Sequence, residues 1–175
     1  LEHSFSPQIV FTPLMGFSRF ILFNTLVMYA LGFVGCLLIM KRFGLALVPF
    51  TILFLLFNFN GHITSHLSSG DPWNGYFLLS FFILLVLELA QPHRANKLGP
   101  SILLSFVLFG IVLQGSFHLY AWCLIFLGIL GMFNRHLLAP VVITVVSSIA
   151  LSAFRFLPAL LVYGGTRHTY ASGFP

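Results

Sequence analysis

Long apolar runs separated by short polar or Gly- and Pro-containing segments dominate this sequence. Dividing the chain at these segments gives six apolar stretches, over residues 17–40, 45–60, 74–90, 100–114, 117–133 and 137–163. Runs such as 77–87 do not alternate apolar and polar residues, as a strand of a membrane barrel would. A helix pairs its backbone amides within its own segment, as lipid requires. The pattern therefore predicts an all-α, polytopic transmembrane fold with about six spans.

The Lys and Arg residues between these stretches predict how the helices are oriented. The connections 61–73 and 115–117 contain neither residue type. The connections after the first, third and fifth stretches contain Lys41, Arg42, Arg94, Lys97 and Arg135. In a chain that crosses the membrane at each stretch, these three connections would all lie on one side. Short cytoplasmic loops hold most of the Lys and Arg of membrane proteins. We therefore expect that side to be cytoplasmic and both chain ends to lie on the outer side.

The composition favours lipid, rather than water, around the helices. Of 175 residues, 59% are hydrophobic and only 6% are charged, whereas soluble domains carry about 25% charged residues. The formal charge of +5 would suggest nucleic acid in a soluble protein. Here the basic residues are scattered singly or in pairs, so we expect membrane lipid and no nucleic acid as a partner. The start at Leu1 and the polar end at Pro175 suggest one transmembrane unit, 1–175, within a longer chain.

The connection between the second and third stretches contains most of the polar side chains expected outside. His62 and His66 would lie one turn apart on one face if the second helix continues past residue 61. Two imidazoles at that spacing can share a metal. Asp71 and His118 are the further ligands that the topology offers, and a divalent metal ion is the cofactor they would hold. Alternatively, the histidines are interfacial side chains hydrogen-bonded to loop carbonyls.

Arg155 interrupts the last apolar stretch. A charge inside the membrane costs about 2.5 to 3.5 kcal/mol on insertion scales, so we expect it to face protein or a water-filled cavity. A guanidinium there could hold a lipid phosphate through paired hydrogen bonds. Two alternatives are that Arg155 extends to the outer interface, or that it forms an ion pair with Asp71.

Other residues within the apolar stretches are expected to act in packing. Asn24 and Gln114 are candidates for hydrogen bonds between helices. Four glycines, as the pairs 32 and 35 and 128 and 131, would let helices approach closely. Glu88 would reach the cytoplasmic interface. The sequence contains no phosphate-binding loop, nucleophile elbow or zinc-type cysteine pair.

Residues 35–45, GCLLIMKRFGL, combine a small residue, an apolar helix end, a basic pair, an aromatic residue and Gly-Leu. This junction resembles those between spans in bacterial polytopic proteins of the GT-C glycosyltransferase type. The remaining likeness, which covers most of the chain, is to membrane proteins named as related to six-pyruvoyl-tetrahydropterin synthase. It rests on Asn60, Gly61, His62, His66, Gly70, Trp73, Gly75, Tyr76, Phe77, Gln114, Gly115, Phe117, His118, Trp122, Arg155, Pro158, Ala159 and residues 173–175.

The resemblance implies a function at the outer face of the bacterial inner (plasma) membrane. GT-C enzymes transfer a sugar from a polyprenyl-phosphate-linked donor and use an acidic residue, typically in the first external loop. That loop would precede this segment, so Asp71, His62 and His66 are the catalytic candidates and Arg155 would hold the lipid phosphate. Two other functions stay open. One is a cofactor-holding subunit with histidine ligands, and the other is a structural subunit packed against other membrane subunits.

Overall fold

The computed structural model describes residues 12–59, 74–91 and 96–165, and over these ranges it contains helices and no strands. The elements are α1 (Thr12–Met15), α2 (Phe17–Phe43), α3 (Leu47–Asn58), the 3₁₀ helix η3 (Asn74–Leu78), α5 (Leu79–Ala90), α6 (Leu98–Leu113), α7 (Phe117–Phe133), the 3₁₀ helix η4 (Arg135–Leu137) and α8 (Leu138–Gly165). The predicted all-α class is therefore confirmed for the described part of the chain.

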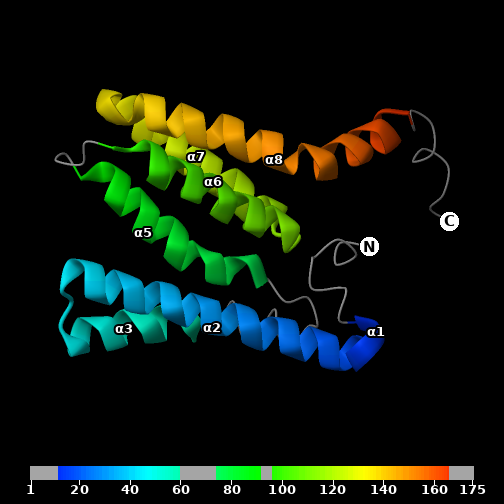
Figure 1. Cartoon of the computed structure of the whole chain (residues 1–175), viewed down its shortest axis with the longest axis horizontal. Helices are drawn as coiled ribbons and strands as arrows, with labels where there is room; N and C mark the ends of the chain where they lie inside the picture. Colours follow the sequence, from blue (N-terminus) through cyan, green and yellow to red (C-terminus); the bar gives the residue numbers. More distant parts are fainter. Residues whose placement is uncertain (1–11, 60–73, 92–95, 166–175) are drawn as a thin grey trace, which may run out of the picture.

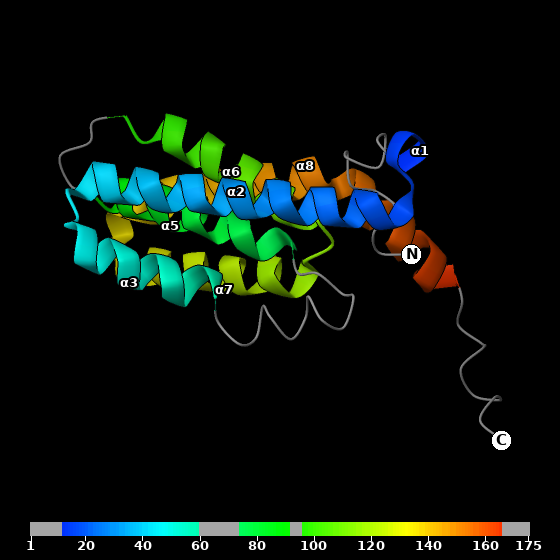
Figure 2. The same cartoon turned by 90° about the horizontal axis from the view of Figure 1, so that it is seen from below.

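The longer helices run along one common axis in two groups (Figures 1 and 2). The antiparallel pair α2 and α3 forms one group, and α6, α7 and α8 form the other. η3 and α5 lie between the groups and contact both α2 and α6. The helix α1 and the C-terminal end of α8 lie at the same end of the molecule, on the right in Figure 1.

Glycine turns set several of the helix ends. The helix α2 continues through Lys41 and Arg42 to Phe43 and stops at Gly44, whose φ of 62° places it in the left-handed region. Glycine has no Cβ to clash there. α6 is followed in the same way by Gly115, with φ of 80°, and the amide of Ser116 donates to the carbonyl of Ile111. The expected tight turn at residues 115 and 116 is confirmed.

Two helices, Arg19–Phe43 and Arg135–Leu157, are long and apolar enough to cross a membrane by length and composition. The other apolar segments are shorter: Leu47–Asn58, Asn74–Ala90, Leu98–Leu113 and Phe117–Phe133. The shortest, α3, has 12 residues, whereas a perpendicular crossing of the hydrocarbon layer needs about 20. Helix length is thus compatible with membrane association, while the six-span topology and the orientation of the ends stay predictions.

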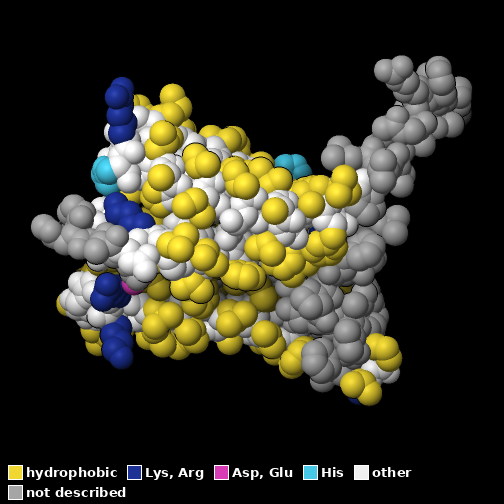
Figure 3. Space-filling view, turned by 45° about the horizontal axis from the view of Figure 1, so that its top comes forward, with side chains coloured by type: hydrophobic (Ala, Val, Ile, Leu, Met, Phe, Trp, Pro, Cys, Tyr) yellow, Lys and Arg dark blue, Asp and Glu magenta, His cyan; other side chains and the backbone are white. Residues whose placement is uncertain are grey.

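The side chains are distributed as lipid, rather than water, would favour. Large apolar side chains cover the described surface, as the yellow areas of Figure 3 show, and they include Leu56, Trp122 and Phe133. By contrast, the interior contains hydroxyl side chains: Ser101, Thr144 and Ser148 are fully buried. The dark blue Lys and Arg side chains visible in Figure 3 gather mainly at one end. There the guanidinium of Arg42 lies 3.3 Å from the carboxylate of Glu88.

Helix packing depends on small residues, as predicted for two of the four glycines. A Cβ on Gly35 would lie 2.0 Å from the Ser80 hydroxyl, and one on Gly32 would lie 3.1 Å from the Phe77 ring. The same expectation is wrong for Gly128, because no described atom lies within 4 Å of its Cβ position. Gly131 has neighbours only at ordinary contact distance. Close approach therefore occurs between α2 and the η3–α5 segment.

Candidate functional site

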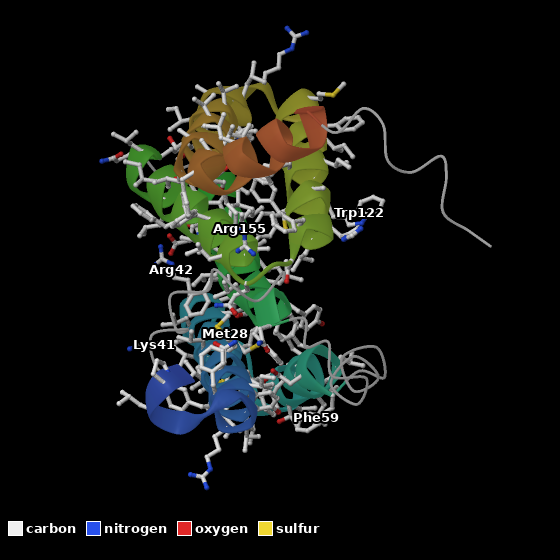
Figure 4. The ribbon with its side chains drawn as sticks, turned by 90° about the vertical axis from the view of Figure 1, so that its right-hand side faces the viewer. Met28, Lys41, Arg42, Phe59, Trp122 and Arg155 are labelled. Carbon is white, nitrogen blue, oxygen red and sulfur yellow. The ribbon has the colours of Figure 1, made fainter. Side chains whose placement is uncertain are left out.

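Arg155 lies on α8 and points into the middle of the molecule, between α6–α8 and the α2–α3 pair (Figure 4). Its Nη1 donates hydrogen bonds to the carbonyl oxygens of Val112, at 2.5 Å, and Leu113, at 2.7 Å. The guanidinium carbon also lies 5.0 Å from the centre of the Phe117 ring. The predicted protein environment of Arg155 is confirmed, and the contacts fix the guanidinium at the C-terminal end of α6.

The chemistry of a helix end explains these contacts. The last carbonyls of an α-helix have no partner within the helix, and the C-terminus carries partial negative charge. The Val112 carbonyl, which also accepts from the Gly115 amide beyond the helix end, uses its second lone pair for Arg155. A guanidinium offers a planar set of donors together with a permanent positive charge. The aromatic face of Phe117 adds a cation–π contact. Arg155 therefore caps α6 and ties it to α8 and to the start of α7.

An amide pair at the same helix end joins the two halves of the molecule. The Asn24 side chain on α2 donates from Nδ2 to Oε1 of Gln114, at 3.3 Å. Gln114 directly follows Leu113, whose carbonyl accepts from Arg155. Hydrogen bonds between helices are a regular device of membrane bundles. The prediction that Asn24 and Gln114 act between helices is confirmed, and they are each other's partners.

Asn74 is a second buried asparagine near this end of α6. The adjacent Gly75 lies so close to α6 that a Cβ there would be 2.5 Å from the Ser116 hydroxyl and 3.3 Å from the Ile111 carbonyl oxygen. On the α2 side, Met28 packs against Phe77. Asn24 precedes Met28 by about one helical turn, and Asn74 precedes Phe77 by a turn of the 3₁₀ helix. The two asparagines are therefore at a similar level of the bundle.

Three polar atoms in this region are buried and have no hydrogen-bond partner among the described residues. They are Oδ1 of Asn24, Oδ1 of Asn74 and the hydroxyl oxygen of Ser152. Ser152 lies on α8, three residues before Arg155. Unpaired buried acceptors are rare in proteins, and each calls for an explanation such as a water or a ligand. We refer to Asn24, Asn74, Gln114, Ser152 and Arg155 as the polar cluster.

The other predicted site residues are not brought together by the described structure. His62, His66 and Asp71 lie outside the described residues. His118 is exposed in the first turn of α7. Within the described ranges, no three His, Cys, Asp or Glu side chains are grouped so that they could hold a metal ion. The metal site and the catalytic roles of Asp71, His62 and His66 stay predictions.

Glu88 is the one carboxylate side chain in the described ranges, and it lies at the end opposite the polar cluster. The described residues of the cluster are amides, a hydroxyl and a guanidinium, which bind and orient ligands but do not supply a carboxylate base. The cluster on its own is therefore suited to binding an anionic or hydroxyl-bearing group.

Comparison of the chain with protein-family models, curated proteins and solved structures found no match. The resemblance to GT-C proteins consequently stays a prediction.

The sequence interpretation missed two members of the cluster, Asn74 and Ser152. A signal for Ser152 was present, because Pro140, Thr144, Ser148 and Ser152 recur at every fourth position of one helix. This spacing predicts a single face, and all four are buried. Asn74 is the first residue of an apolar stretch. A polar residue at that position is equally expected if it faces the membrane interface. Its position alone therefore did not indicate that it would be buried.

Proposed function

We propose that this chain is a multi-pass membrane unit that binds the phosphate of a lipid carrier near Arg155. More specifically, we propose that it is a portion of a GT-C-like glycosyltransferase that takes a sugar from a polyprenyl-phosphate carrier. The reaction would take place at the outer face of the bacterial plasma membrane. Asp71, His62 and His66 are the proposed catalytic or divalent-metal residues of that activity.

The fixed position of Arg155 is the observation that carries the proposal. A phosphate at the end of a lipid chain is an anion beside hydrocarbon, and arginine is the side chain best suited to recognise it. Two carbonyls and one aromatic ring hold this guanidinium. Its orientation is therefore set before a ligand arrives, which lowers the entropy cost of binding. The guanidinium also lies at the C-terminal end of α6, away from the end of the bundle at which α2 and α5 finish and at which the Arg42–Glu88 pair lies (Figure 1).

The test is the affinity of the detergent-solubilised protein for a polyprenyl phosphate. Arg155→Gln removes the positive charge and keeps N–H groups that can donate to the α6 carbonyls. We expect its dissociation constant to rise by about 10-fold or more, because a charge-assisted hydrogen bond contributes about 1.5 to 3 kcal/mol. Arg135→Ala, at the opposite end, is the matched control and should change the affinity by less than about twofold.

The melting temperature of each variant separates binding from folding. If Arg155→Gln has a normal melting temperature and binds as tightly as Arg135→Ala, the phosphate role of Arg155 is ruled out. Arg155→Lys tests the contribution of the guanidinium shape, because it keeps the positive charge and loses the planar set of donors. We expect Arg155→Lys to retain an affinity between those of the wild type and Arg155→Gln.

A purely structural subunit is the second candidate, and the hydrogen bonds from Arg155 to Val112 and Leu113 favour it. Helix capping by itself would explain an arginine at this position. Under this function, Arg155→Gln lowers the melting temperature and leaves polyprenyl phosphate binding absent or unchanged. The two measurements above therefore distinguish the candidates.

A further inference from the structure

Two buried asparagine oxygens in the polar cluster are unused by the fold. Asn24 is 6% exposed and Asn74 is 4% exposed. The Oδ1 atom of each has no hydrogen-bond partner among the residues that the structure describes. A buried acceptor that stays unpaired lowers the stability of the folded protein. Two such acceptors at one level of the bundle are a feature that packing does not explain.

Their position connects them to the guanidinium. The Asn24 amide donates to Gln114, which directly follows the two residues whose carbonyls accept from Arg155. Asn74 is next to Gly75, whose Cα packs against Ser116 just beyond the same helix end. The asparagines and Arg155 are thus grouped around the C-terminal end of α6.

The chemistry of the three side chains narrows the ligand. An amide oxygen accepts hydrogen bonds, so the bound group must donate them. A metal cation or an ammonium group would be repelled by the permanent charge of Arg155. Neutral hydroxyl groups can donate hydrogen bonds and carry no positive charge. A sugar attached to a phosphate presents several hydroxyl groups beside an anion.

We propose that Asn24 and Asn74 form a subsite for the sugar hydroxyls of a lipid-phosphate-linked sugar. The subsite rests on the proposed function, because Arg155 would hold the phosphate of the same ligand. Entry requires η3 to move away from α6, since both oxygens are buried. η3 is suited to such a shift, because the hydrogen bonds of a 3₁₀ helix have poorer geometry than those of an α-helix.

The experiment compares two phosphodiesters of one polyprenol. One is a hexosyl diester, prepared with glucose, mannose and galactose in turn, and the other is the methyl diester, which has the same charge and no hydroxyl group. We expect the wild type to prefer at least one hexosyl diester by about 10-fold. In Asn74→Leu and Asn24→Leu the preference should fall to about twofold or less, with affinity for the methyl diester retained.

Asn134→Leu is the control. The Asn134 side chain also donates from Nδ2 to a carbonyl oxygen four residues earlier, that of Leu130, but Asn134 follows α7 next to Arg135, at the end of the bundle away from η3. Its replacement should leave the hexosyl preference at the wild-type value. Asn24→Leu also breaks the hydrogen bond to Gln114. If that variant has a lowered melting temperature, the sugar preference is judged from Asn74→Leu alone.

The two proposals fail in different ways. If the wild type binds all hexosyl diesters and the methyl diester equally, the sugar subsite is contradicted and the phosphate site stands. The same conclusion follows if Asn74→Leu keeps the wild-type preference. If the wild type binds none of the diesters, the proposed function and the subsite both fall.

Discussion

Single small residues determine how closely the helices of this protein approach. Gly35 of α2 lies against Ser80 of α5, and Gly75 of η3 lies against Ser116 after α6. Helices that associate in lipid have no hydrophobic driving force between them, so close contacts of this kind contribute much of the association energy of membrane bundles. The identity of a few glycines therefore matters more than the many interchangeable Leu, Ile and Phe side chains on the surface.

Replacement of Gly35 by alanine tests this point. The added Cβ would lie 2.0 Å from the Ser80 hydroxyl oxygen and 2.7 Å from the Ser80 Cβ, so α2 and α5 must separate. We expect a loss of about 1 to 3 kcal/mol, as for other overpacked sites, observed as a lower melting temperature in detergent. Gly128→Ala is the control, because its Cβ position is open and alanine favours the helix by about 0.5 to 1 kcal/mol. Equal melting temperatures for the two variants would contradict the packing described.

For single residues, the sequence predicted which side chains act between helices better than it predicted the partner of each. Asn24 and Gln114 were recognised as polar groups between helices because few other roles suit an amide within an apolar run. Their pairing, and the carbonyl partners of Arg155, depend on how each helix is rotated. Uniformly apolar helices give little information about rotation, since their lipid-facing and protein-facing sides have similar residues.

At the scale of the elements, the lengths of the apolar stretches and the turn residues between them predicted the positions of the helices well. The helix over 117–133 has the expected bounds. α6 begins at Leu98, two residues before the expected residue 100, and the amide of Leu98 donates a hydrogen bond to the Asn96 side chain. The stretch from residue 74 begins as a 3₁₀ helix, which hydropathy does not distinguish from an α-helix.

The contact between α6 and α8 is the most extensive between two helices of the described part, and it contains hydroxyl groups. The Thr144 hydroxyl lies 2.9 Å from the Pro140 carbonyl oxygen of its own helix and 3.2 Å from the Ser101 carbonyl oxygen of α6. In addition, the hydroxyl groups of Tyr120 on α7 and Ser148 on α8 lie 3.2 Å apart. These polar contacts supplement the apolar packing of the three-helix group.

Thr144→Val, which keeps the shape of the side chain and removes its hydroxyl, should reduce stability by about 0.5 to 1.5 kcal/mol. Thr51→Val is the matched control, because the exposed Thr51 hydroxyl bonds only within its own helix, to the Leu47 carbonyl. Reversible unfolding of both variants in mixed micelles gives the two free energies. A larger loss for Thr51→Val than for Thr144→Val would refute the role of the inter-helix hydrogen bond.

The candidate site was predicted only in part. Arg155 was identified because an arginine within an apolar stretch needs a protein or aqueous partner. Asn74 and Ser152 were missed, because their burial follows from the position of η3 against α6 and from the rotation of α8. The proposed catalytic and metal residues His62, His66 and Asp71 lie outside the described residues.

At the scale of the whole molecule, four of the six Lys and Arg residues in the described ranges lie at one end of the bundle, the others being Arg19 near the start of α2 and Arg155 on α8. Lys41 and Arg42 end α2, Lys97 precedes α6, and Arg135 lies between α7 and α8. These residues gather at one end, and apolar side chains cover much of the surface beyond them (Figure 3). The arrangement matches the distribution of positive charge in the cytoplasmic loops of membrane proteins.

The most direct test of the membrane account is labelling of single introduced cysteines with a membrane-impermeant maleimide in intact cells and in inverted vesicles. The native Cys36 and Cys123 are buried, so the unmodified protein supplies the background. We predict that Lys41→Cys and Arg135→Cys react only in inverted vesicles and that His118→Cys reacts only in intact cells. Labelling of Lys41→Cys and Arg135→Cys from opposite sides, or recovery of the protein in the soluble fraction, would contradict the account.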